Sequence, residues 1–210
     1  MIFDITYQER YSRGELLLRS FFGWIYIFIP HIFVLVFMQL WAAILSFIAF
    51  WSILFTGRYP RSFFDFQVKL LRWNQRVNAR MYNLSDGYPA FGLDVDDPAI
   101  QFSLDYPERL SRGSVLLKFF FGWLYVAIPH GFVLMFLAIA VQFAVFFNWW
   151  IILFTAKSSR SIHDFLVGFL RWGVRVSLYL GYMTDDYPPF RLDPLPSELP
   201  PTNPIAEEQV

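Results

Sequence analysis

The sequence predicts an all-α integral membrane protein built from two tandem repeats, and three observations support this prediction. Of the 210 residues, 56% are hydrophobic, 21% are aromatic and only 16% are charged, whereas a soluble domain carries roughly 25% charged residues. Two windows, residues 20–57 and 119–156, contain no Asp, Glu, Lys or Arg. A shift of 99 residues overlays the first half of the chain on the second without a gap, and nearly half of the aligned residues are identical.

The composition also excludes several functional classes. Lys plus Arg and Asp plus Glu both number 17, so the chain lacks the basic excess of a nucleic-acid-binding protein. It has no Cys, which excludes disulfides, thiolate metal sites and thiol nucleophiles. It has no Gly-rich phosphate loop, no His-Glu-x-x-His and no Gly-x-Ser-x-Gly. We therefore expect a non-enzymatic protein.

Each charge-free window is longer than one membrane span requires. A helix over such a window would rise about 57 Å, while the hydrocarbon core is about 30 Å thick. We therefore expect a hairpin in each window, about four spans in total, which places all 17 basic residues on one side, as the positive-inside rule favours. The alternative is a bent helix in each window, broken at Pro30 and Pro129, with an interfacial arm before each break.

A basic amphipathic helix is predicted after each window, over residues 61–83 and 160–182. Charged residues recur there at spacings of three and four, opposite a face rich in Phe and Trp. Such a helix is suited to the lipid headgroup layer; the alternative is a helix packed on the bundle. The residues expected to bind headgroups are Arg61, Lys69, Arg72, Arg76, Arg80, Arg160, Arg171 and Arg175.

The repeat also predicts the domain organisation. Residues 1–98 form the first repeat and residues 99–193 the second, related by a pseudo-twofold axis along the membrane normal. Residues 3–7 and 102–106 alternate apolar and polar side chains, so we expect short strands that join the halves on the cytoplasmic side. Residues 194–210 contain five Pro and are predicted to be an extended, acidic tail.

Two histidines are the sharpest candidates for a functional site. His31 and His130 occupy equivalent positions, each follows a Pro, and both lie in the apolar windows. An ionisable residue inside a membrane segment is a functional candidate, and the two could ligate a haem or other pigment between the halves. Alternatively, each histidine caps carbonyls freed by its Pro or lies at the water interface. No other metal site is predicted, and His163, whose repeat partner is Phe64, is assigned no role.

The repeated motifs resemble those of a known family. They are Pro-His inside an apolar run, Leu-Phe-Thr-Gly-Arg-Tyr-Pro-Arg at residues 54–61, Asp-Phe, Leu-Arg-Trp, Arg-Val and Asp-x-Tyr-Pro-x-Phe. This pattern is similar to the bacterial membrane family catalogued as domain of unknown function 4389. The resemblance covers both halves, although residues 156–159 of the second half depart from the pattern. It implies a bacterial membrane protein and carries no established activity.

These observations together lead to a functional expectation. We expect an accessory or scaffold subunit of a larger complex in the bacterial inner membrane, a multi-pass protein with cytoplasmic termini. Its expected partners are membrane lipids, anionic ones included, and other membrane-protein subunits, with no nucleic acid and no cofactor. The alternatives are a protein that binds haem or another pigment through His31 and His130, and a lipid-handling membrane protein.

Overall fold

Each apolar window forms one continuous helix of 44 residues in the computed structural model, which describes residues 1–198. In the first half, α1 (Arg13–Gly23) passes through a π-helical turn (Trp24–Phe28) into α2 (Ile29–Thr56). In the second half, α4 (Arg112–Gly122) passes through the turn Trp123–Ala127 into α5 (Ile128–Thr155). The predicted hairpin within each window is therefore wrong. Neither window has a group of polar turn residues near its middle that would reverse the chain.

The π-helical turns explain why Pro30 and Pro129 do not break these helices. A proline removes one helical hydrogen bond, and its ring clashes with the carbonyl four residues before it. Widening the turn just before each proline relieves this clash while the helix continues. The alternative prediction of an irregularity at each proline is thus partly confirmed, since the helix changes its winding there but continues without a break. The interfacial arm before each irregularity stays a prediction.

The long helices begin and end with recognisable caps. Ser12 and Ser111 accept hydrogen bonds from the backbone N–H groups of Glu15 and Ser114, as N-cap residues do. The first long helix ends at Gly57, which has the left-handed conformation (φ 74°) common at helix ends. Its repeat partner, Ala156, adopts the same conformation (φ 56°), at a cost that glycine avoids.

The predicted amphipathic helices are present as α3 (Arg61–Met81) and α6 (Arg160–Leu180). Each turns back along the long helix before it, α3 on α2 and α6 on α5. In α3 the apolar face packs on α2, since Leu70, Trp73 and Val77 form a buried cluster with residues of the long helix. The apolar face is therefore covered by protein rather than lipid, which confirms the packed alternative and corrects the prediction of a surface-lying helix.

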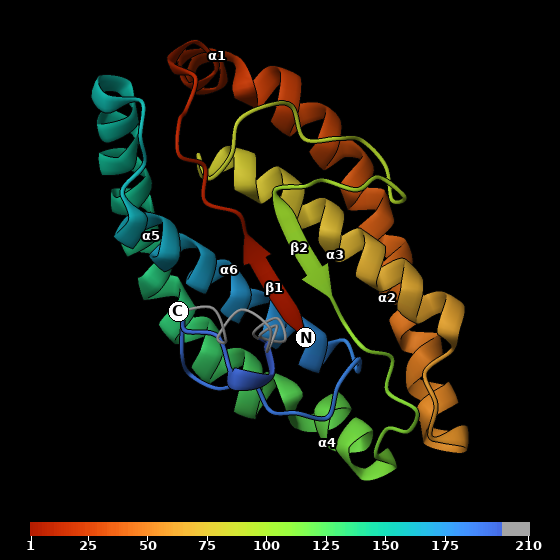
Figure 1. The fold of residues 1–210 in the computed structure, drawn as a ribbon. Coiled ribbons are helices and arrows are strands. Elements are labelled where there is room, and N and C mark those ends of the chain that lie inside the picture. Colours follow the sequence, from red (N-terminus) through yellow and green to blue (C-terminus); the bar gives the residue numbers. More distant parts are fainter. Residues whose placement is uncertain (199–210) are drawn as a thin grey trace, which may run out of the picture.

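Two short strands mark the pseudo-twofold axis. Strand β1 (Ile2–Ile5) pairs antiparallel with β2 (Ile100–Ser103), and the strands lie across α3 and α6 near the centre of the molecule (Figure 1). In this register Phe3 lies opposite Phe102, its own equivalent after the 99-residue shift. The axis therefore passes between these two residues. The predicted strands are confirmed, with bounds shifted by one to three residues.

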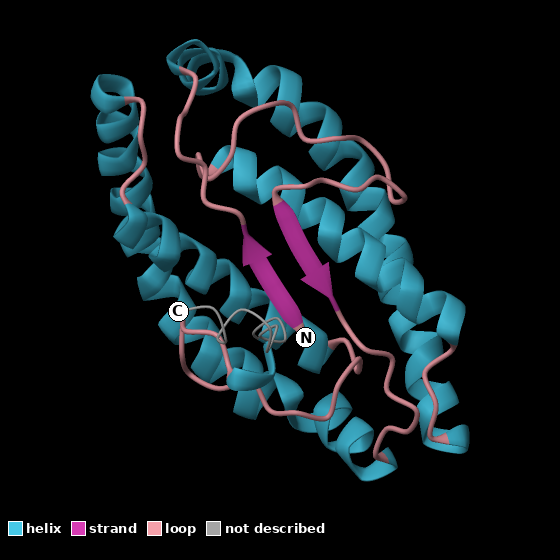
Figure 2. Cartoon of the chain, in the orientation of Figure 1, coloured by secondary structure: helices cyan, strands magenta, loops and turns pink. Residues whose placement is uncertain are grey.

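The halves exchange their N-terminal arms, residues 1–12 and 99–111. The Tyr11 N–H donates to the Ala156 carbonyl and the Leu110 N–H to the Gly57 carbonyl, both at 2.9 Å. Strand β1 packs on α6 of the other half, and β2 packs on α3. Each long helix thus starts beside the end of the other, and the two run antiparallel along opposite edges of the molecule (Figure 2). The sequence repeats are therefore not separate structural units.

The tail is partly anchored. The predicted extended segment begins at residue 194, but Pro196–Glu198 form a 3₁₀ turn, and the Glu198 carboxylate is buried against Arg175. The rest of the predicted tail, residues 199–210, lies outside the described residues.

The matched helix ends generate a stability prediction. Ala156→Gly should stabilise the protein by about 0.5–1 kcal/mol, because glycine removes the left-handed strain but adds freedom to the unfolded chain. Gly57→Ala should destabilise it by a similar amount, since a Cβ there meets only the Leu110 carbonyl oxygen at 3.7 Å and the cost is conformational. Denaturant unfolding in detergent micelles measures both, and shifts of the same sign would contradict this account.

Candidate functional site: the buried histidine and arginine clusters

Three repeated motifs meet around each window histidine. His31 is fully buried, and the Trp73 indole N–H donates to its Nδ1 at 2.9 Å. Tyr88 and Phe91 cover its ring from the loop after α3, with ring centroids 5.3 and 4.5 Å away. The Pro-His, Leu-Arg-Trp and Tyr-Pro-x-Phe motifs therefore form one aromatic box.

The second half repeats this box and extends it. The Trp172 indole N–H donates to His130 Nδ1 at 2.9 Å, and Phe190 stacks on the imidazole, with ring centroids 3.9 Å apart. Because Nδ1 accepts a hydrogen bond, a neutral ring carries its proton on Nε2. His130 Nε2 lies 3.1 Å from the Tyr187 hydroxyl, which in turn donates to the Tyr125 carbonyl. The result is a chain of hydrogen bonds from helix α6 to the π-helical turn.

The first half lacks this extension. His31 Nε2 is buried and has no hydrogen-bond partner among the described residues. Tyr88 stacks on Tyr26, with ring centroids 6.1 Å apart. The two boxes thus share their architecture but differ at one nitrogen atom.

Each histidine packs against aromatic side chains of its own half, so the structure does not join them into one site. Their Nδ1 atoms accept from indoles instead of capping carbonyls freed by proline. Within residues 1–198, no group of three or more His, Cys, Asp or Glu could hold a metal ion. Haem or pigment ligation at these histidines stays a prediction, and a ligand at either Nε2 would have to displace the covering Tyr and Phe.

Two arginines at equivalent positions of the repeats bind the loops that cover the boxes. Arg76, 1% exposed, donates to the carbonyls of Gly92 and Val95. Its equivalent, Arg175, donates to the carbonyls of Arg191 and Asp193 at 2.9 and 2.8 Å. Each loop is therefore fastened to its helix by a guanidinium, whose several fixed donors suit this task.

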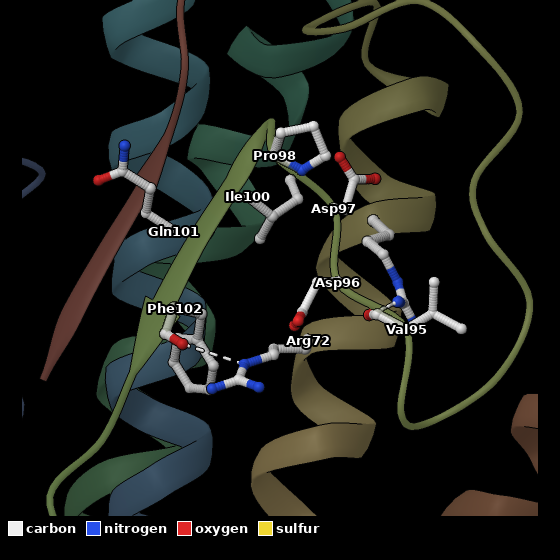
Figure 3. Close-up of a pocket in the computed structure, with 9 residues that line it drawn as sticks. Arg72, Val95, Asp96, Asp97, Pro98, Ile100, Gln101 and Phe102 are labelled. Atoms are coloured by element: carbon white, nitrogen blue, oxygen red, sulfur yellow. Dashed lines mark hydrogen bonds between the residues drawn. The ribbon is translucent and has the colours of Figure 1, made fainter.

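Another arginine pair binds the exchanged arms. Arg72 Nε donates to the Phe102 carbonyl at 3.0 Å, and Arg171 Nε donates to the Phe3 carbonyl at 3.1 Å. In Figure 3 the Arg72 guanidinium reaches from α3 to β2 beside Asp96. Both residues line a groove of about 440 Å³, and its walls include further arginine and aspartate side chains. Arg72 and Arg171, which the sequence predicted to bind lipid headgroups, thus join the halves at the pseudo-twofold axis.

The structure separates the predicted headgroup-binding residues into two groups. Arg61 and Arg160 are exposed, and Lys69 is partly exposed beside Asp94. The other five are buried or half-buried and contact the protein's own carbonyls or carboxylates: Arg72, Arg76, Arg80, Arg171 and Arg175. Headgroup contact stays a prediction for the first group, while the second group serves the fold.

Electrostatics at the arginine clusters fit this structural role. Burial lowers the pKa of Arg76 from its ordinary value, with Asp97 acting in the opposite direction. Burial alone would raise the pKa of Glu198, but hydrogen bonds from Arg175 and the Leu195 N–H hold that pKa below its usual range. Glu198 is therefore an ionised partner of Arg175 at neutral pH.

His163, which the sequence left without a role, connects the arm to α6. It is 3% exposed, and its Nε2 lies 2.9 Å from the Ile5 carbonyl. Tyr7 packs edge-on against its ring, as Tyr106 packs against Phe64 in the other half. The sequence lacked a signal for this contact because the partners lie far apart in the chain and the histidine is present in one repeat only.

Comparison with known proteins gives one family. The sequence profile described as Domain of unknown function (DUF4389) matches twice, over residues 17–92 and 117–191. These matches contain both histidines, both indole partners and the arginines that fasten the loops. No curated protein and no solved structure matches the chain.

The aromatic boxes generate a second prediction. Trp73→Phe should destabilise the protein by about 1–3 kcal/mol, because it leaves His31 Nδ1 buried without a donor. Trp172→Phe should act similarly. Trp41→Phe is the control, since Trp41 is 50% exposed on the long helix. Denaturant unfolding in micelles measures all three, and equal effects of Trp73→Phe and Trp41→Phe would contradict the structural role of the indole.

The contact of His163 predicts a pH effect. Burial lowers the pKa of His163 from its ordinary value, so the folded protein holds it neutral while the unfolded chain protonates it below about pH 6.5. Stability should therefore fall as the pH drops from about 7 to 5. His163→Phe, which installs the residue of the first repeat, should weaken this dependence. Denaturant unfolding of the wild type and of His163→Phe at both pH values tests this prediction. The same loss of stability in the two proteins would refute the assignment.

Proposed function

The chain belongs to the family described as domain of unknown function 4389, and from this premise we propose a non-enzymatic membrane scaffold that lies within one leaflet. In this proposal the two long helices lie parallel to the bilayer surface. Helices α3 and α6, the strands and the loops form a polar layer above them. The protein occupies the cytoplasmic leaflet of the bacterial inner membrane, with its described charged segments on the cytoplasmic side.

The distribution of exposed apolar side chains supports this arrangement. Along each long helix, buried or half-buried residues recur every three or four positions, and the other positions are largely exposed. The exposed residues are large and apolar, as with Phe33, Leu40 and Phe47, which are 53–66% exposed. A soluble monomer rarely exposes an apolar patch larger than a few hundred Å². A surface of this composition and length is suited to contact with lipid.

Helix length and the course of α3 favour an in-plane orientation. A 44-residue helix rises about 66 Å, roughly twice the thickness of the hydrocarbon core. Helix α3 runs back along α2, and its charged residues extend from Arg61 to Arg80. If α2 crossed the bilayer, Asp65 and Lys69, both more than 40% exposed, would lie at membrane depth. Charges there are costly, and an in-plane orientation avoids this cost.

The pseudo-twofold axis leads to the same orientation. The two long helices are antiparallel, and the axis passes through the β1–β2 pair. If the helices crossed the bilayer, this pair, with Asp4 and Gln101, would lie midway through it. With the axis along the membrane normal, the strands lie on the polar side. This single feature, charged and strand-forming segments gathered on one side of two apolar helices, carries the proposal.

The polar layer would serve as the docking platform. Arg61 and Arg160 lie near the starts of α3 and α6 and are exposed, so they can contact anionic headgroups, at about 1 kcal/mol per residue. The aspartate-containing loops on the same layer are available to a further membrane-protein subunit. We therefore propose an accessory role within a larger inner-membrane complex.

The orientation has a direct test because the sequence contains no Cys. Arg58 and Lys157 are exposed repeat equivalents at the ends of the two long helices. Since the helices are antiparallel, a spanning arrangement places these residues on opposite sides, whereas the in-plane arrangement places both on one side. Arg58→Cys and Lys157→Cys should be labelled by a membrane-impermeant maleimide only from the cytoplasmic side of membrane vesicles.

Controls make this result decisive. Asp94→Cys, in an exposed loop of the polar layer, should be labelled from the same side. Detergent solubilisation should make all three positions reactive, which shows that the thiols are accessible. Labelling of Arg58→Cys and Lys157→Cys from opposite sides would eliminate the in-plane proposal.

His31 keeps a second function open, because its buried Nε2 has no partner among the described residues. A haem bound there would give the purified protein a Soret absorbance band that His31→Ala removes. If the protein purified from cells grown with haem precursor shows no such band, this alternative is wrong.

A further inference from the structure

An uncharged polar cavity lies on the pseudo-twofold axis between α3 and α6. It has a volume of about 270 Å³. Asn74, Gln75 and Asn78 of α3 line one wall, and their repeat equivalents line the other, namely Gly173, Val174 and Ser177. Large amide side chains therefore face small residues, and this difference between the repeats leaves the space open. A Cβ added at Gly173 would meet no atom within 4 Å.

The cavity opens on the side that the proposed function assigns to lipid. Residues on a helix are rotated by about 100° per position, so Asn74 and Asn78 leave α3 opposite Arg72 and Arg76, which contact the arm and loop. Gln39 and Asn74 also line an adjoining groove of about 390 Å³ along α2. The other residues of this groove are Ile32, Leu35, Val36 and Leu40. The polar cavity thus continues into an apolar groove on the exposed face of the long helix.

The amides at this site have unused hydrogen-bonding capacity. Gln75 is 6% exposed, and its Nε2 donates to no group within residues 1–198, while its Oε1 accepts from Asn78 at 3.4 Å. Asn74 Nδ2 donates to the Leu70 carbonyl at 2.8 Å, which leaves its Oδ1 free. Both atoms are accessible rather than sealed inside the protein, and polar groups without partners are unfavourable beside lipid. The site therefore presents both a free donor and free acceptors to an occupant.

We propose that this cavity binds the head of an uncharged glycerolipid, with one acyl chain in the groove on α2. The inference rests on the proposed in-plane arrangement, which brings the opening to lipid. Among the described residues that line the cavity and the groove, none is charged, so a phosphate would have no counter-charge. A hydroxyl and an ester carbonyl match a site with free acceptors and a free donor, whereas a quinone can only accept. Diacylglycerol has this chemistry.

Dioctanoylglycerol is a suitable probe, and its binding is measured by native mass spectrometry of the full chain released from mild detergent. One molecule should bind per wild-type chain. Gly173→Leu should abolish this binding by filling the cavity. Gly131→Leu is the matched control, because Gly131 is an exposed helical glycine where an added Cβ also meets nothing within 4 Å. It should bind as wild type does.

A second variant tests the polar contact without filling the cavity. Gln75→Val installs the residue of the second repeat at the equivalent position, and should weaken binding about tenfold through loss of the amide. Dioctanoyl phosphatidylglycerol and a short-chain quinone should bind at least about tenfold more weakly than dioctanoylglycerol. Undiminished binding to Gly173→Leu, or equal binding of either competitor, overturns the proposal. Because binding is measured in detergent, its failure is distinct from failure of the in-plane topology, which the cysteine labelling reports.

Discussion

The fold depends on one constraint: two 44-residue apolar helices have protein on only one narrow face. In our proposal lipid covers their remaining surface, and the charged helices that run beside them contact water or headgroups. These two contacts are compatible when the helices lie parallel to the membrane surface. The exchanged arms then hold the two helices together, since β1 packs on α6 and β2 on α3. A single repeat would lack these contacts and leave its arm without a partner.

The residues identical in both repeats stabilise the covering loops and arms. Trp73 and Trp172 donate to buried histidines, Arg76 and Arg175 fasten loop carbonyls, and Arg72 and Arg171 hold the exchanged arms. Backbone carbonyls in loops cannot pair within a sheet or helix, so buried guanidinium groups satisfy several at once. Residue identity between the repeats therefore reflects shared architecture. The difference between the repeats, with amides on α3 facing small residues on α6, creates the cavity where we propose lipid binding.

Much of this architecture could be predicted from the sequence. Periodicity identified α3 and α6, alternation identified both strands, and the internal repeat implied the twofold relation that the Phe3–Phe102 pairing realises. The hairpins were wrong because span length was used to divide windows that lack a polar turn near their middle. Helices that lie in the membrane plane, as we propose, have no such length limit. The roles of Arg76 and Arg175 were missed because charge periodicity identifies a polar face without revealing whether loops or lipid cover it.

Polarised infrared spectroscopy of the protein in aligned bilayers tests the central claim most directly, because the amide I dichroism reports helix orientation. The long helices and the helices packed along them contain most of the helical residues. The in-plane arrangement predicts that the average helix axis lies parallel to the bilayer surface. A dichroic ratio that places the average axis along the membrane normal would contradict it.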